Sequence, residues 1–174
     1  METKPLTLPV FLEFVELKTK VASVFPMCIG FAWSQWQYHQ LNVTNSLLFA
    51  LAVIAFDMCT TAINNTMDYH KAYDVTYQRD ENVIGKHQLN FKSMTFIIYG
   101  LLIFASLISL LLVVRTDLLL LPVGALCFLI GIFYTFGPYP LSRLPLGELF
   151  SGVTMGFGIF FLAIYVHAPQ QLFY

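Results

Sequence analysis

Carboxylate and amide side chains recur between residues 57 and 74, where an apolar run gives way to a polar segment. The residues Asp57, Thr61, Asn64 and Asp68 are separated by four, three and four positions. At about 100° of rotation per residue, this spacing places all four on one narrow face of a helix. Asp57 lies within the apolar run, where an ionisable side chain is costly unless it faces a polar interior. The sequence therefore predicts a polar line that leads from membrane depth to the end of this helix.

At the end of that helix, Asn65, Asp68 and Asp74 cluster within ten positions. Hard oxygen ligands of this kind suit magnesium, which takes one or two carboxylates and completes its octahedron with substrate phosphates and water. Carboxylates that face a diphosphate need such a cation, because the like charges otherwise repel. The cluster therefore predicts a site for a metal-bound diphosphate.

The polar segment that follows carries cations of its own at Lys71, Arg79, Lys86 and Lys92. Such side chains can neutralise diphosphate oxygens and a departing pyrophosphate. The alternative is that this segment is basic only because cytoplasmic loops of membrane proteins are basic. Lys86 is favoured slightly over the others, because a glycine precedes it in a compact loop.

The elements that must position these residues are transmembrane helices. The chain has 174 residues, of which 57% are apolar and 11% charged, whereas a soluble domain has roughly half and a quarter. About 20 apolar residues cross a bilayer, and the polar stretch at residues 37–45 divides the first apolar run into two helices. We expect an all-α integral membrane bundle of about five spans, near residues 21–36, 46–65, 93–114, 118–136 and 148–166.

The distribution of basic residues predicts the orientation of this bundle. With five spans and a cytoplasmic N-terminus, eight of the nine basic residues fall on the inner side, and Arg115 alone falls outside. The positive-inside rule therefore places both polar loops, residues 68–92 and 134–148, in the cytoplasm. The net charge of −1 argues against a nucleic-acid partner, which requires a basic face.

Three further segments carry weaker expectations. Residues 1–20 alternate apolar and charged positions, which fits either an amphipathic helix on the membrane surface or a helical lead-in to the first span. They lack the pattern of a cleavable signal peptide, so the first span is expected to be a permanent anchor. The glycines at 152, 156 and 158 suggest close helix packing in the last span.

Three stretches of the chain together resemble the UbiA-type membrane prenyltransferases. They are ELKTKVASVFPMCIG (16–30), DMCTTAINNTMDYHKAYD (57–74) and YTFGPYPLSRLPLGELFSGVTMGF (134–157). Within that family they look most like the members that prenylate 1,4-dihydroxy-2-naphthoate in menaquinone biosynthesis. The resemblance implies transfer of a polyprenyl group from polyprenyl diphosphate to an aromatic carbon, at the cytoplasmic face of a bacterial cell membrane.

The resemblance also implies roles for individual residues. Asn64, Asp68 and Asp74 would bind magnesium, with the two aspartates as the catalytic pair. The substrate diphosphate would be bound by a wider set, namely Asn64, Asn65, Lys71, Arg79, Lys86 and Tyr139. Asn65 stands where many relatives have aspartate, which leaves one formal charge fewer at the metal. The aromatic side chains Phe56, Tyr134 and Tyr139 are candidates to stabilise an allylic cation through their π faces.

The sequence departs from the family pattern in its length. Family members have about nine transmembrane helices and a second aspartate motif in the C-terminal half, whereas after Glu81 this sequence has only Asp117 and Glu148 as acidic residues. We therefore expect residues 1–174 to form a single prenyltransferase-like domain that corresponds to the N-terminal portion of the family. The alternatives are an inactive truncated member, a membrane binding protein, or a channel fragment in which Asp57, Asn64 and Asp68 line an ion path.

Overall fold

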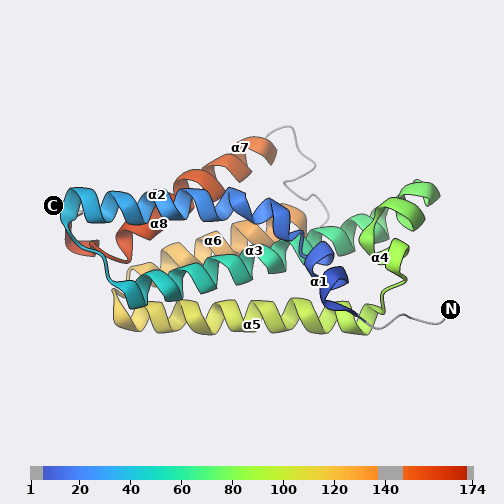
Figure 1. Ribbon diagram of the computed structural model, residues 1–174, viewed down its shortest axis with the longest axis horizontal. Helices are drawn as coiled ribbons and strands as arrows, with labels where there is room; N and C mark the ends of the chain where they lie inside the picture. Colours follow the sequence, from blue (N-terminus) through green and yellow to red (C-terminus); the bar gives the residue numbers. More distant parts are fainter. Residues whose placement is uncertain (1–5, 137–146, 172–174) are drawn as a thin grey trace.

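The computed structural model describes residues 6–136 and 147–171, and all its regular elements in these ranges are helical (Figure 1). This confirms the expected all-α membrane bundle. The main helices are α1 (Leu8–Phe14), α2 (Val21–Tyr38), α3 (Val43–Lys71), α4 (Val83–His87), α5 (Phe91–Arg115), α6 (Leu120–Thr135), α7 (Gly147–Ser151) and α8 (Ile159–Tyr165). A 3₁₀ turn (Leu17–Lys20) joins α1 to α2, and π-helical segments precede α4 (Tyr77–Glu81) and α8 (Gly152–Gly158); a last 3₁₀ turn covers Pro169–Gln171.

The break between the first two long helices lies where the polar stretch predicted it. His39 ends α2 in the left-handed conformation, with φ of 53°. Asn42 then begins α3 as its N-cap, because its side-chain oxygen accepts a hydrogen bond of 3.0 Å from the Asn45 amide. A left-handed residue and a capped helix start thus turn one long apolar run into two antiparallel helices.

Helix α3 is the central element and runs through 29 residues to Lys71, six residues beyond the predicted end of the span. It lies along α5 on one side, while α2 packs against α8 (Figure 1). Gly30 allows that second contact, because a Cβ atom there would stand 2.6 Å from the Cβ of Ala163. The extension of α3 places Asn64, Asn65 and Asp68 on a continuous helix.

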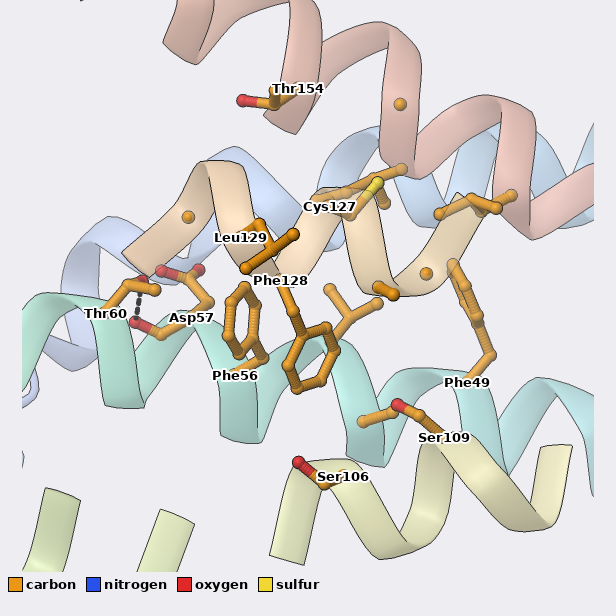
Figure 2. Close-up of a pocket in the computed structure, with 18 of the residues that line it drawn as sticks. Phe49, Phe56, Asp57, Thr60, Ser106, Ser109, Cys127, Phe128, Leu129 and Thr154 are labelled. Carbon is orange, nitrogen blue, oxygen red and sulfur yellow. Dashed lines mark hydrogen bonds between the residues drawn. The ribbon is translucent and has the colours of Figure 1, made fainter. Parts of the chain in front are cut away.

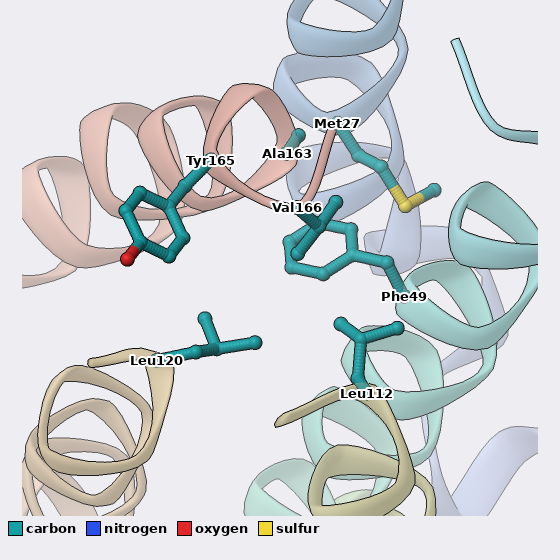
Figure 3. Packing of buried hydrophobic residues seen from close by; sticks show 7 residues of the cluster. All are labelled: Met27, Phe49, Leu112, Leu120, Ala163, Tyr165 and Val166. Atoms are coloured by element: carbon teal, nitrogen blue, oxygen red, sulfur yellow. The ribbon is translucent and has the colours of Figure 1, made fainter. Parts of the chain in front are cut away.

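Two apolar clusters hold the bundle together at its two ends. We call the end that contains α1, α4 and residues 64–71 the motif end. Its cluster comprises Phe14, Val15, Ala62, Val83, Ile84 and Met94. The cluster at the opposite end joins α2, α3, α5, α6 and α8 with Val166, the residue that follows α8. It comprises Met27, Phe49, Leu112, Leu120, Ala163, Tyr165 and Val166 (Figure 3).

Three helical stretches of the described chain are long and apolar enough to cross a membrane, namely Val43–Lys71, Phe91–Arg115 and Gly147–Tyr165. Helix α6 is apolar but shorter, at 16 residues. The number of spans, five, therefore stays a prediction. The predicted close packing is not found at Gly152 and Gly156 among the described residues, because apart from their chain neighbours and their own helical backbone no atom lies within 4 Å of a Cβ built at either position. These glycines lie in the π-helical segment, whereas close packing occurs at Gly30 and Gly131.

Candidate diphosphate site and cavity

Asn64 and Asp68 are neighbours on one face of α3, half-buried at the motif end. The Asn64 side-chain amide donates a hydrogen bond of 3.2 Å to Oδ2 of Asp68. The Asn64 amide group and the Asp68 carboxylate therefore lie side by side, one turn apart, as their spacing of four predicts. Asn64 and Asp68 are two of the three residues predicted to bind magnesium, and the structure places them in contact.

Asp74 lies beyond the end of α3 and is exposed. Its Oδ1 accepts a hydrogen bond of 2.8 Å from the Thr76 amide, which begins the turn that leads to the π-helical segment. Two carboxylates and one amide carbonyl are the hard oxygen donors that a magnesium ion uses when substrate phosphates complete its shell. The ligand types of Asn64, Asp68 and Asp74 are therefore suitable for magnesium. Among the described residues, no group of three or more His, Cys, Asp or Glu side chains converges on one point.

Asp57 lies deeper along the same face of α3 and is 9% exposed. Its Oδ1 accepts a hydrogen bond of 2.7 Å from the Lys20 ammonium, and its Oδ2 accepts one of 2.6 Å from the Ser23 hydroxyl. Lys20 also donates to Oγ1 of Thr61 at 2.6 Å and to the Asp57 carbonyl at 3.3 Å. All three ammonium protons are therefore directed at acceptors, and the ion pair is almost fully enclosed by protein.

The sequence did not predict this partner. The predicted orientation places Lys20 on the inner surface with the other basic residues, but the structure buries it, with only 4% of the residue exposed. A signal was present, because an aspartate within an apolar helix requires a cation or donors, and Lys20 immediately precedes the first apolar span. Choosing Lys20 over the other basic residues requires the three-dimensional crossing of α2 and α3.

A cavity of about 570 Å³ begins beside Asp57 and extends toward the opposite end of the bundle. Its walls come from α3, α5, α6 and the segment from Ser151 to Leu162. Figure 2 shows Asp57 and Thr60 at one end, next to the stacked rings of Phe56 and Phe128, with Phe49 farther along. The two rings have centroids 4.0 Å apart. Asp57, Ser106, Ser109 and Thr154 are among its polar lining residues, and the rest of the described lining is mainly apolar.

Two of the aromatic residues suggested by the sequence line this cavity, Phe56 and Tyr134. Gly131 of α6 brings the wall close to α3, because a Cβ there would lie 2.6 Å from Cε1 of Phe56. Tyr139, the third aromatic candidate, lies outside the described residues. Most of the loop that was expected to open beside the site, residues 137–146, is likewise outside them.

Asn65 points to a different neighbour from Asn64. Its side-chain amide donates to the Phe14 carbonyl at 2.9 Å and to the Glu16 carboxylate at 3.1 Å. Its backbone carbonyl accepts a hydrogen bond from Asn82 at 3.1 Å. The structure thus uses Asn65 to join α3 to the N-terminal segment and to the start of α4, and its predicted contact with diphosphate stays a prediction.

The predicted cations follow α3 around the motif end. Lys71 is half-buried in the last turn of α3, and Arg79 is exposed in the π-helical segment. Lys86, at the end of α4, forms an ion pair of 2.7 Å with Glu13 of α1. His87 approaches the second oxygen of the same carboxylate at 2.8 Å. Hydrogen bonds from Lys86 and His87 hold the pKa of the Glu13 carboxyl below its ordinary value of 4.5.

The fold and the site together define an all-helical membrane protein with a carboxylate and amide pair on α3, one to two turns from the end of an apolar cavity. The sequence matches the model of the UbiA prenyltransferase family over residues 23–173. Because this match covers most of the chain, the protein belongs to that family.

One curated relative gives the family match a biochemical context. The chain is 23% identical over 153 residues to 1,4-dihydroxy-2-naphthoate octaprenyltransferase of Bacillus subtilis (strain 168). The aligned region covers 87% of this chain and 49% of the relative, so the chain spans about half the length of that protein. No solved structure matches the chain.

Proposed function

We propose that this protein takes part in the transfer of a prenyl group from a prenyl diphosphate to an aromatic acceptor. The observation that carries the proposal is the arrangement on α3, where the Asn64 and Asp68 pair stands at the motif end and the apolar cavity begins one to two turns deeper, beside Asp57. A prenyl diphosphate has the same polarity, with a charged head and a long hydrocarbon tail. The cavity volume lies within the range of small-molecule sites.

The reaction requires the bond between the prenyl C1 carbon and the diphosphate oxygen to break, with both electrons leaving on pyrophosphate. The allylic cation is then attacked by an aromatic carbon, which later loses its substituent proton or carboxyl group. Asn64, Asp68 and Asp74 would hold magnesium, which when bound neutralises the diphosphate oxygens. Lys71, Arg79 and Lys86 would add positive charge around the leaving group.

The cavity walls would protect the cation from water. Phe56 and Phe128 stack at the cavity end that lies nearest the diphosphate site, and Tyr134 lies on the neighbouring wall. Their π faces can stabilise positive charge without donating a nucleophile. Exclusion of water matters, because hydrolysis of the cation would compete with transfer.

For the acceptor, we propose 1,4-dihydroxy-2-naphthoate, and hence a step in menaquinone biosynthesis. The support is the activity for which the Bacillus subtilis relative is named, together with the resemblance of the three sequence stretches given above. A cavity formed by membrane helices also suits a polyprenyl tail that stays in lipid.

The test is a transfer assay with the chain in lipid nanodiscs, supplied with octaprenyl diphosphate, Mg²⁺ and either dihydroxynaphthoate or 4-hydroxybenzoate. We expect prenylated naphthoate, loss of product with EDTA, and recovery with Mg²⁺. Asp68→Asn should lower the rate by about 100-fold, the scale on which loss of a charge-stabilising group acts. Asp80→Asn, at an exposed carboxylate in the following segment, is the matched control and should change the rate little. Failure to form product from either acceptor would contradict the proposal for this chain.

A further inference from the structure

The Lys20 and Asp57 ion pair has a feature that its role in packing does not require, which is that Asp57 also lines the cavity. Among the described residues that line it, Asp57 is the one acidic or basic residue of the types Asp, Glu, Lys, Arg and His. A pair needed only to cross α2 with α3 could be enclosed on all sides. Here Asp57 lines a space large enough for a ligand.

The hydrogen bonds around this carboxylate leave part of its capacity unused. An ionised carboxylate can accept about four hydrogen bonds, and Asp57 accepts one from Lys20 and one from Ser23. The Ser23 hydroxyl also lies 3.0 Å from the Lys20 carbonyl, so its proton is shared between two acceptors. Next to an apolar cavity, unused acceptor capacity favours a ligand that donates a hydrogen bond.

The partners of Asp57 also restrict the charge of that ligand. Lys20 neutralises the carboxylate, so a cationic ligand gains little net attraction. The Lys20 ammonium is itself fully directed at Asp57 and Thr61, so it has no proton to offer to an anion. A neutral donor on an apolar body, such as the hydroxyl group of an aromatic ring, satisfies both conditions.

The distance along α3 agrees with this ligand. Asp57 and Asn64 are seven residues apart on one face, which corresponds to about 10 Å along the helix axis. This separation accommodates an aromatic ring between the carboxylate and the carbon next to the diphosphate. Thr60 lines the cavity on the side of Asp57 that faces Asn64, and the stacked Phe56 and Phe128 rings form the wall beside Asp57 itself.

We propose that Asp57, held by Lys20 and Ser23, accepts a hydrogen bond from a hydroxyl group of the aromatic acceptor and thereby selects hydroxylated rings. This inference rests on the proposed function and deepens it. It also sets the orientation of an acceptor that carries a carboxylate. The acceptor carboxylate must point away from Asp57, toward the basic side chains of the motif end.

The experiment measures binding, so that it does not depend on transfer. Affinities of 4-hydroxy-2-naphthoate and 4-methoxy-2-naphthoate are measured by naphthoate fluorescence with the protein in nanodiscs, with empty nanodiscs as the reference. The two compounds differ only in the donor proton and one methyl group. We expect the wild type to bind the hydroxy compound at least about tenfold more tightly, the effect of one hydrogen bond to a charged group.

The informative variant replaces both members of the pair, Lys20→Met with Asp57→Leu, which removes the acceptor and leaves no buried charge without a partner. We expect the affinity ratio to fall to about one in this variant. The control is Cys59→Ala, which removes a buried side chain of α3 whose sulfur faces the Ile98 carbonyl on α5, outside the cavity lining. It should keep the wild-type ratio.

A wild type that binds both compounds equally, or neither, overturns the inference, and so does a double variant that retains the tenfold preference. The transfer assay separates this failure from failure of the proposed function. Product formation without hydroxyl selectivity leaves the function standing and removes the role of Asp57. Hydroxyl selectivity without product formation supports the role of Asp57 in binding and removes the proposed transfer activity.

Discussion

At the level of single residues, Asp57 and its three partners decide how a charge is accommodated inside this bundle. Lys20 of the 3₁₀ turn, Ser23 of α2 and Thr61 of α3 supply donors and an acceptor, so that neither charge is left without hydrogen bonds. Removing one member of such a buried pair is far more costly than removing both, because the remaining charge keeps its desolvation cost.

We therefore expect Lys20→Met to lower the free energy of unfolding by about 3–5 kcal/mol, the usual cost of leaving a buried charge without its partner. The double variant with Asp57→Leu should recover most of this loss. The measurement is the midpoint of thermal or denaturant unfolding in detergent for the wild type, both single variants and the double variant. Additive losses in the double variant would contradict a direct coupling between the two side chains.

The residues of the candidate site were predictable to different extents. The Asn64 and Asp68 contact follows from helical spacing alone, because residues four apart share a face. The direction of Asn65 was not predictable in this way. It lies one position from Asn64, about 100° around the helix, and what it meets there depends on where the N-terminal segment packs.

At the level of elements, α1 is the part whose placement the sequence left most open. Its apolar residues Phe14 and Val15 are fully buried against α3 and α4, so its apolar side faces protein. Glu16, with φ of 49°, turns the chain sharply between α1 and the 3₁₀ turn. A left-handed glutamate is not encoded by any local pattern, which explains why neither of the two expectations for residues 1–20 included this turn.

Helix α4 is fixed to the rest of the motif end by close backbone contact and by the pair with α1. A Cβ at Gly85 would lie within clashing distance of the Gln78 carbonyl, so this position requires glycine. Glu13 then connects α1 to both Lys86 and His87. Lys86, one of the basic residues that the resemblance assigns to diphosphate binding, therefore already forms an ion pair with Glu13.

We expect the contact between α1 and α4 to weaken in acid. The pKa of Glu13 is lowered in the folded protein, so its contribution to stability is present above the ordinary value of 4.5 and is lost as the pH falls through the lowered value. Hydrogen exchange of the backbone amides of residues 8–15 should show faster opening below pH 4.5 than at pH 7. Glu13→Gln should open α1 at pH 7 to a similar extent and should remove the pH dependence, whereas Glu81→Gln, at an exposed carboxylate in the same region, should retain it. Identical protection of α1 at both pH values in the wild type would refute this linkage.

At the level of the whole molecule, hydropathy predicted the helices well and their packing poorly. The observed starts and ends of α2, α5 and α6 lie within two residues of the predicted spans, because the boundary between apolar and polar residues coincides with the helix ends. Which helices cross is decided by small side chains such as Gly30 and Gly131 and by buried pairs, neither of which alters a hydropathy profile.

The orientation of the bundle can be tested with the contrast between its two ends. The motif end carries Lys71, Arg79, Lys86 and Lys92, whereas the opposite end carries Arg115 among the described residues. Lys20 no longer contributes to this count because it is buried, yet the asymmetry survives its removal. The positive-inside rule then predicts that the motif end, with the candidate site, faces the cytoplasm.

Single cysteines introduced into a variant without Cys28, Cys59 and Cys127 provide the measurement. Asp80 lies at the motif end and Gln40 in the turn at the opposite end, and both are exposed. In intact bacterial cells, a membrane-impermeant maleimide should label Gln40→Cys and should label Asp80→Cys only after permeabilisation. The reverse pattern would place the site on the outer face, and the cationic segment would then have to be explained by ligand binding rather than by topology.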